Sequence, residues 1–218
     1  MNIKKVHTSD KVLSYLRKKI MLNELKEGDH LKESKLSSEL NISRGPIREA
    51  ITKLEAEHLV ETLSNGRTVV KRFDINEIRD LYDGRILLEK HALTQIDRES
   101  LEKNIDKLHL YIKQMQESQN SGFRDVESDM DFHALLIDMT NNQTLIQLWY
   151  SLNGLIRTLI EVTSTHTSKH EQTIIKEHKV IVEALTKGEI EKAQEFLANH
   201  LENASDHYCA AVKELGGK

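Results

Sequence analysis

The sequence has few of the residues that crosslink or interrupt a chain. It contains one cysteine and one proline among 218 residues. The lone cysteine, Cys209, excludes an internal disulfide and fits a reducing compartment. A single proline favours long, uninterrupted helices. No apolar run approaches the ~20 residues of a membrane-spanning helix. The N-terminal MNIKKVHTSDKVL lacks a signal-peptide core, so we expect a cytoplasmic protein with no membrane partner.

Charge is divided unevenly along the chain. Residues 1–72 contain 15 Lys and Arg against 10 Asp and Glu, whereas residues 73–218 contain 16 against 25. A basic segment followed by an acidic one indicates that only the first meets a polyanion, although a chance fluctuation of surface charge is the alternative. The length suits two modest domains, which we expect at residues 1–72 and 73–218.

The basic segment has the pattern of helix, turn, helix and hairpin. Apolar spacing predicts a first helix over residues ~8–23 and a short second helix near residue 36. Ser43 is a good N-cap for a third helix, because its hydroxyl can accept an orphan backbone N–H. Pro46 lies in the first turn of that helix, where no intrahelical bond is lost. This order is typical of a helix-turn-helix.

Two short β-branched runs follow the third helix. They cover residues 59–62 and 68–71. Asn65-Gly66 between them is a hairpin signal, because both residues tolerate positive φ. The hairpin completes the pattern of a winged helix-turn-helix that reads DNA.

The third helix carries the candidate DNA-reading side chains. Arg44 and Arg48 lie at i and i+4 and so share one face, which is distinct from the apolar stripe of the helix. Arginine can hold a guanine edge bidentately or bind a phosphate. The alternative is a helical hairpin with solvated arginines, but the full order of elements favours DNA binding. We expect the DNA contacts to include Ser43, Arg44, Gly45, Pro46, Arg48, Gly66 and Arg67.

The acidic segment is helical almost to its end. No strand-like alternation occurs in it. We therefore predict a mostly α fold, in which the winged helix-turn-helix is followed by an all-α bundle of about six helices. The expected helices cover residues 74–97, 99–120, 122–140, 142–165, 167–187 and 189–214.

Three of the eleven histidines fall on apolar helix faces. Asp129 and His133 lie at i and i+4, so both point from one face of their helix. His178 and His200 lie on apolar stripes on either side of the turn at Lys187-Gly188. At ~1.5 Å rise per residue they sit at similar depth in an antiparallel helix pair. One aspartate and three histidines can thus converge from three helices.

Such a cluster suits a first-row metal ion. Imidazole supplies nitrogen ligands, and the carboxylate supplies charge and oxygen. Zinc fits this set, and nickel, manganese and iron fit it too. The alternative is that each is a core histidine satisfied by a hydrogen bond, and the residues alone leave both possibilities open.

The two segments resemble the two parts of one family of regulators. The run LKESKLSSELNISRGPIREAITKLEAEHLV resembles the winged helix-turn-helix of GntR-type bacterial transcription regulators. Some relatives have a DNA-contacting arginine where this chain has Ser34, so we assign Ser34 no strong contact. The resemblance implies a homodimer that binds double-stranded operator DNA. In that family the residues that lie at the DNA match Ser43, Arg44, Gly45, Pro46, Arg48 and Gly66.

The acidic segment resembles the FCD ligand-binding domain of the FadR subfamily. The similar stretches are DMDFHALLIDMTNNQTL and EHKVIVEALTKGEIEKAQEFLANHLENA. Metal-binding members carry an Asp-x₃-His, a later His before an acidic or glycine turn, and a final His after it. In this sequence these positions are Asp129, His133, His178 and His200. The resemblance therefore implies a divalent metal ion, with zinc the first choice.

The resemblance also implies a small carboxylate effector. In the subfamily the arginine at the position of Arg85 faces the effector pocket and suits a carboxylate, and Arg157 is a weaker candidate of the same type. The alternative for Arg85 is an ordinary surface ion pair with Asp83 or Glu89.

Three functions remain to be compared. The first is a DNA-binding regulator controlled by a small organic acid at the metal site. The second is a regulator in which the metal is structural or is itself the signal. The third, a metal-dependent enzyme, lacks an identifiable general base, a nucleophile elbow, a P-loop and a dinucleotide fingerprint. We therefore expect a regulator and not an enzyme.

Overall fold

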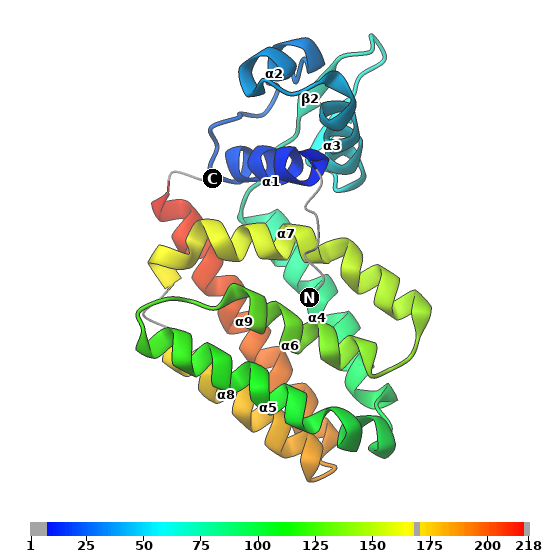
Figure 1. Cartoon of the computed structure of the whole chain (residues 1–218), viewed down its shortest axis with the longest axis vertical. Coiled ribbons are helices and arrows are strands. Elements are labelled where there is room, and N and C mark those ends of the chain that lie inside the picture. Colours follow the sequence, from blue (N-terminus) through cyan, green and yellow to red (C-terminus); the bar gives the residue numbers. More distant parts are fainter. Residues whose placement is uncertain (1–7, 168–170, 216–218) are drawn as a thin grey trace. The chain divides into compact units, whose positions relative to one another are not determined.

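The computed structural model describes residues 8–167 and 171–215. Over these residues the chain forms nine helices and one two-stranded sheet (Figure 1). It divides into two compact units. The first runs to Asn76 and includes the chain end from Val212, and the second covers Glu77–Ala211. The mostly α fold, with a winged helix-turn-helix and a helical bundle, is confirmed.

The first unit is built on three helices and a small hairpin. Helix α1 packs against α3, and α2 packs against α3 on another side. Leu16 from α1 and Ile47 and Leu54 from α3 have no exposed surface, so the apolar stripes predicted from helical spacing form the core. The elements are α1 (Thr8–Met21), α2 (Glu33–Leu40), α3 (Arg44–Ala56), β1 (Val60–Thr62) and β2 (Thr68–Val70).

The turn between α2 and α3 is made by two residues of different backbone conformation. Asn41 adopts the left-handed conformation, with φ 52°, and ends α2. Ser43 is extended, with φ −60° and ψ 157°, and is the N-cap residue of α3. Its side chain makes no cap hydrogen bond, so the expectation that the Ser43 hydroxyl caps the helix was wrong. The N-cap backbone alone starts the helix here, and Pro46 lies in the first turn.

The hairpin turn places only one of the two expected residues, Gly66, at positive φ. Gly66 has a φ of 76°, but Asn65 is not among the residues with positive φ. The Gly66 N–H donates to the Leu63 carbonyl at 2.8 Å, and the Leu63 N–H donates to the Arg67 carbonyl at 2.9 Å. These two bonds close a loop of three residues between Leu63 and Arg67, with Gly66 in the left-handed position. The Asn65 side chain accepts from the Arg67 N–H at 3.0 Å.

A third segment, which the sequence pattern did not indicate, pairs with the hairpin. His30 pairs with Val69 in an isolated antiparallel bridge. The Leu31 N–H donates to the Thr68 carbonyl, and the Val70 N–H donates to the Asp29 carbonyl, both at 2.9 Å. This pairing ties the loop before α2 to β2, which fixes the wing beside the helix-turn-helix.

The described residues of the second unit form six helices (Figure 1). Helix α6 is the most buried of them, and α5 and α7 both pack against it. Asp97 and Asp125 cap α5 and α6 through their carboxylates. Among the described residues, no helix is long and apolar enough to cross a membrane. The helices are α4 (Ile75–Gln95), α5 (Arg98–Asn120), α6 (Val126–Asp138), α7 (Gln143–Thr167), α8 (Glu171–Thr186) and α9 (Ile190–Glu214).

Candidate metal centre and DNA-reading face

Four side chains meet in the interior of the helical unit. Asp129 and His133 come from α6, His178 from α8 and His200 from α9. All four are buried, and one ligand atom from each lies within 4.8 Å of the others. The helical spacing of Asp129 and His133 puts both on one face of α6. The α8–α9 turn, closed by Gly188 with a φ of 71°, sets the other two at matching depth.

The imidazole rings point their Nε2 atoms toward one another. The Nε2 atom of His133 lies 3.3 Å from that of His178 and 3.3 Å from that of His200. The Nε2 atom of His178 is 3.5 Å from Oδ1 of Asp129. Two nitrogen ligands at about 2.0–2.1 Å from one zinc ion are separated by roughly 3.3–3.4 Å in tetrahedral geometry. The observed separations fit ligands of one metal ion.

The other nitrogen of each ring is already engaged. Nδ1 of His133 lies 2.6 Å from Oε2 of Glu89, and Nδ1 of His178 lies 2.8 Å from the Ile174 carbonyl. Nδ1 of His200 lies 2.8 Å from Oε2 of Glu177. Carbonyls and carboxylates only accept, so each Nδ1 carries the proton and each neutral Nε2 presents a lone pair. Three lone pairs and a carboxylate therefore face one point without a proton between them, which favours a cation there.

Electrostatics keep these groups in their metal-binding forms. Burial lowers the pKa of His133, and burial together with the nearby His200 lowers the pKa of His178 well below its usual range. Burial would raise the pKa of Asp129, but interactions with His178, with Arg124 and with further neighbours lower it to about 2. At neutral pH His133 and His178 are therefore neutral and Asp129 is ionised, as metal coordination requires.

Arg85 and Glu89 form a buried ion pair beside the cluster. Both lie on α4, and the Arg85 Nε–H donates to Oε1 of Glu89 at 2.7 Å. The indole N–H of Trp149 donates to the same oxygen at 2.9 Å. The pairing with Glu89 was one alternative from the sequence, but it is an interior pair and not a surface one. Arg85 Nη2 is buried and has no hydrogen-bond partner among the described residues.

A second arginine reaches the same region from the loop before α6. Arg124 Nη2 donates to the Tyr208 hydroxyl at 2.8 Å. The rings of Tyr208 and Tyr82 are 5.7 Å apart, and the Arg85 guanidinium lies 5.5 Å from the Tyr82 ring centre. The charges of Arg124 and Arg85 both act on Asp129. Arg124 was not among the predicted site residues, because nothing in the pattern of a loop arginine indicates that it folds inward.

Arg157 lies in a different setting from Arg85. It pairs with Glu127 of α6, and the Glu127 side chain is 73% exposed. The Arg157 side chain is itself 28% exposed. The structure therefore does not bring Arg157 together with Arg85.

The expected DNA-reading residues lie on one accessible surface of the first unit. Ser43, Arg44, Gly45 and Arg48 at the start of α3 are exposed, as are Gly66 and Arg67 of the wing; Pro46 is half-buried. A groove of about 320 Å³ runs between α3, the wing and the loop before α2. Its lining includes His30, Lys32, Ser34, Arg44, Gly66 and Thr68.

Arg48 is held by a partner that the sequence analysis did not identify. Its Nε and Nη2 atoms donate to the two carboxylate oxygens of Glu33, each at 2.9 Å. The pair is exposed, and the Arg48 hydrogen bond lowers the pKa of Glu33. Glu33 opens α2, so this contact joins the two helices of the helix-turn-helix.

Comparison with known proteins decides the family. Residues 8–70 match the family described as bacterial regulatory proteins, gntR family, and residues 80–203 match the FCD domain. The chain is a GntR-family transcriptional regulator with an FCD domain. The family expected from the sequence is thereby confirmed, and its relatives are transcriptional regulators and not enzymes.

Named relatives align with this GntR regulator over most of their length. The HTH-type transcriptional regulator YdhC of Bacillus subtilis is 26% identical over 204 residues, covering 91% of this chain and 90% of YdhC. The gluconate operon transcriptional repressor of Bacillus licheniformis is 24% identical, with 84% and 77% covered. The solved structure of Lar, which controls the Listeria monocytogenes agr system, has a TM-score of 0.67 at 22% identity. It covers 94% of this chain and 98% of Lar, and shows the same fold.

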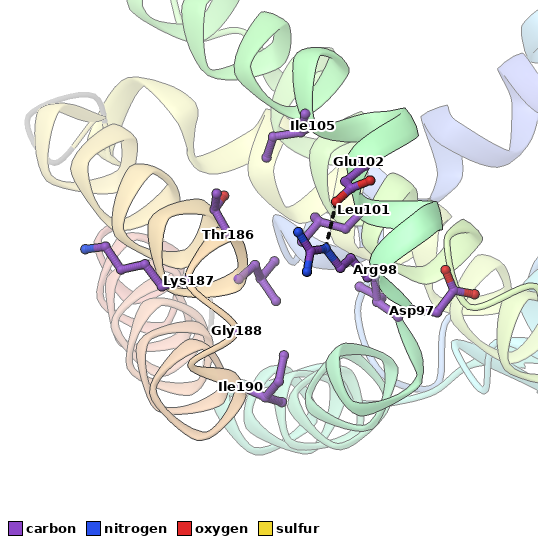
Figure 2. Close-up of a pocket in the computed structure, with 11 residues that line it drawn as sticks. Asp97, Arg98, Leu101, Glu102, Ile105, Thr186, Lys187, Gly188 and Ile190 are labelled. Carbon is purple, nitrogen blue, oxygen red and sulfur yellow. Dashed lines mark hydrogen bonds and ion pairs between the residues drawn. The ribbon is translucent and has the colours of Figure 1, made fainter.

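The FCD domain of this GntR regulator also has a pocket apart from the cluster. It encloses about 450 Å³ between the α4–α5 and α8–α9 turns (Figure 2). Leu101, Ile105 and Ile190 supply apolar walls, and Arg98 is paired with Glu102 at 2.7 Å. None of its lining residues belongs to the Asp/His₃ cluster. The cluster and Arg85, and not this pocket, carry the chemistry suited to a metal and an acid.

Proposed function

We propose that this GntR-family regulator binds operator DNA under the control of a small organic acid held at a metal centre in its FCD domain. One observation carries the proposal. Four acceptor groups converge without a proton among them, and the unpartnered Nη2 of buried Arg85 belongs to the same interior network. A metal cation would satisfy the four acceptor groups, and an anionic oxygen would satisfy Nη2 of Arg85.

The proposed metal ligands are Asp129, His133, His178 and His200. Zinc is the first choice because imidazole and carboxylate ligands suit it, and nickel, manganese or iron would fit the same donors. When bound, the metal supplies a Lewis-acidic centre for an oxygen of the acid. The carboxylates behind the rings, Glu89 and Glu177, orient His133 and His200 and increase their basicity as ligands.

The proposed effector is a small carboxylate. Arg85 would offer Nη2 to one of its oxygens, and Arg124 is a further cation whose charge acts on Asp129. Arg157 remains a weaker candidate, because it would have to leave Glu127. The relative that represses a gluconate operon supports an acid as the class of signal. Binding would favour one arrangement of the DNA-binding units over another.

The proposed DNA contacts lie on the accessible face of the first unit. Two-fold symmetric operators are read by dimers, so we propose a homodimer that acts on DNA in the cytoplasm. Arg44 and Arg48 would enter the major groove at the start of α3, while the wing tip would lie at the backbone or minor groove. The full proposed set is Ser43, Arg44, Gly45, Pro46, Arg48, Gly66 and Arg67.

The DNA part of the proposal is tested on duplexes selected from a random pool by the wild-type protein. Arg44→Ala and Arg48→Ala should each weaken binding of the selected duplex by 5- to 150-fold, from about 1–3 kcal/mol per lost bidentate contact. Lys192→Ala, which removes one positive charge from the FCD domain, is the matched control and should bind as the wild type does. Unchanged isotherms for both arginine variants at fixed salt would count against the assignment.

The proposed control by an organic acid has one competing interpretation, in which no acid is needed and the metal is either structural or itself the signal. A metal bound by four ligands from three helices would also hold these helices together and stabilise the bundle. DNA titrations with apo-protein, with zinc, and with zinc plus acetate, lactate, malonate or citrate separate the two. A change in DNA affinity that needs an acid supports the proposal. A change complete with zinc alone supports the competing interpretation.

A further inference from the structure

One buried carboxylate touches both halves of the proposed sensor site. Glu89 has no exposed surface, and its two oxygens have different partners. Oε1 accepts from Arg85 Nε at 2.7 Å and from the Trp149 indole at 2.9 Å. Oε2 lies 2.6 Å from Nδ1 of His133. The candidate acid-binding arginine and the metal-ligand histidine are therefore hydrogen-bonded to the two different oxygens of one carboxylate.

Glu89 is held as an anion in this position. Its Oε1 is paired with the Arg85 guanidinium and also accepts from the Trp149 indole, and this pairing with a buried cation suits an ionised carboxylate. An ionised carboxylate can only accept, so it keeps the proton of His133 on Nδ1 and leaves the Nε2 lone pair for the metal. The same carboxylate holds Arg85 by its Nε atom, which leaves Nη2 available to an anion.

We infer that Glu89 is a positioning residue that links metal binding to acid binding, an inference that rests on the proposed function. A cation on Nε2 makes the Nδ1–H of His133 a stronger donor, which draws the carboxylate toward the ring. Glu89 then compensates the charge of Arg85 less completely, and Arg85 binds an anion more tightly. Linkage makes the effect reciprocal, so a bound acid tightens metal binding by the same factor.

A second carboxylate of the cluster provides the matched control. Glu177 accepts from His200 Nδ1 at 2.8 Å, as Glu89 does from His133. Its other oxygen accepts from the Asn203 amide at 2.8 Å and not from an arginine. Glu177 therefore orients a metal ligand without joining it to the candidate acid site.

The chemistry of glutamine at each position predicts different outcomes. In Glu89→Gln the single carbonyl oxygen suits Arg85 and Trp149, so the amide NH₂ faces His133 and moves its proton to Nε2, where it blocks the metal. Loss of the carboxylate also leaves the Arg85 charge uncompensated, which favours an anion. Glu177→Gln should disturb the metal in the same way but should not free an arginine.

The experiment measures zinc affinity by competition with a chelator and then acid affinity at saturating zinc by calorimetry. The acid is whichever of acetate, lactate, malonate and citrate binds the zinc-loaded wild type most tightly. Both variants should lose about 10- to 100-fold in zinc affinity. Only Glu89→Gln should bind the acid several-fold more tightly. Nitrogen NMR of the apo-protein should show His133 as the Nε2–H tautomer in Glu89→Gln and as Nδ1–H in the wild type.

Two results overturn the inference. One is the same His133 tautomer in wild type and Glu89→Gln, and the other is an acid affinity that responds equally to Glu89→Gln and Glu177→Gln. If no acid binds the zinc-loaded wild type, the proposed function fails, whereas an unchanged tautomer with normal acid binding refutes only the role of Glu89. Should Glu89→Gln not fold, Arg85→Gln serves instead. It touches no metal ligand, yet it should raise zinc affinity several-fold without any acid, and an unchanged affinity would refute the link.

Discussion

Metal binding at the Asp129/His133/His178/His200 cluster should stabilise the helical unit measurably. The unfolded chain does not hold these four side chains together, so a metal that binds the folded form shifts the unfolding equilibrium. Free zinc at one hundred times its dissociation constant contributes about 2.7 kcal/mol. For a unit of this size each kcal/mol raises the melting temperature by about 2–4 °C. The expected shift is therefore roughly 5–11 °C.

The geometry makes this shift specific to the four ligands. Three Nε2 atoms and the Asp129 carboxylate face one another at separations that suit a metal, and the Nδ1 partners hold the rings in place. Removing one ring should remove most of the stabilisation, because three remaining ligands bind zinc far more weakly in a site built for four. His133→Ala and His178→Ala should melt at nearly the same temperature with and without zinc.

Calorimetric unfolding at pH 7.5 measures the effect. The protein is stripped with a chelator, dialysed and compared with and without added zinc, nickel, manganese and iron(II). His91→Ala is the control, because His91 is an exposed α4 histidine and its variant should keep the full shift. The reasoning is refuted if no metal raises the melting temperature of the wild type. It is also refuted if His133→Ala keeps the wild-type shift.

Three further predictions concern pH, the second arginine and the DNA face. Apo-protein should lose stability as pH falls from 7 to 5, by up to about 2.7 kcal/mol per pH unit, as seen in melting curves. The sign follows because His133 and His178 have lowered pKa values, so below 6.5 only the unfolded chain takes up these protons. Arg124→Gln should weaken acid binding to zinc-loaded protein by about tenfold, because one charge-assisted hydrogen bond is lost. Calorimetry measures this affinity. Glu33→Gln should leave the slope of log K against log salt unchanged in fluorescence anisotropy, because Arg48 already exchanges Glu33 for DNA in the wild type; a slope steeper by about 0.9 would show that wild-type Arg48 stays on Glu33.

Helical periodicity was sufficient for the architecture and for the residues that meet at the cluster. The i, i+4 spacing of Asp129 and His133 fixes their common face on α6, and the short turn at Gly188 makes α8 and α9 antiparallel. These relations are local, so they can be read from sequence alone. The mostly α fold was predicted in this way, and the GntR family was predicted from the resemblance of the sequence motifs; both are confirmed.

The groups behind the ligands could not be predicted, because tertiary packing decides their partners. Glu89 lies four residues after Arg85, a spacing that is equally common in exposed pairs. Its contacts with Trp149 and His133 join residues 60 and 44 positions away. The hydrogen bonding of the Ser43 hydroxyl and the conformation of the turn at Asn65-Gly66 could not be predicted either, because each residue type permits more than one hydrogen-bond arrangement.

The two arginines that matter most to the proposed function are both prepositioned by a glutamate, but burial gives the two pairs opposite behaviour. Arg48 and Glu33 are 69% and 33% exposed, and such pairs contribute only about 0–1 kcal/mol. DNA phosphates or a guanine edge can therefore replace Glu33 at little cost. Arg85 and Glu89 are 2% and 0% exposed, and breaking a buried pair costs about 3–5 kcal/mol. Arg85 should therefore keep Glu89 and bind a ligand with its remaining Nη2. When the ligands bind, Arg48 thus exchanges its glutamate for DNA, whereas Arg85 keeps its glutamate and gains a second partner.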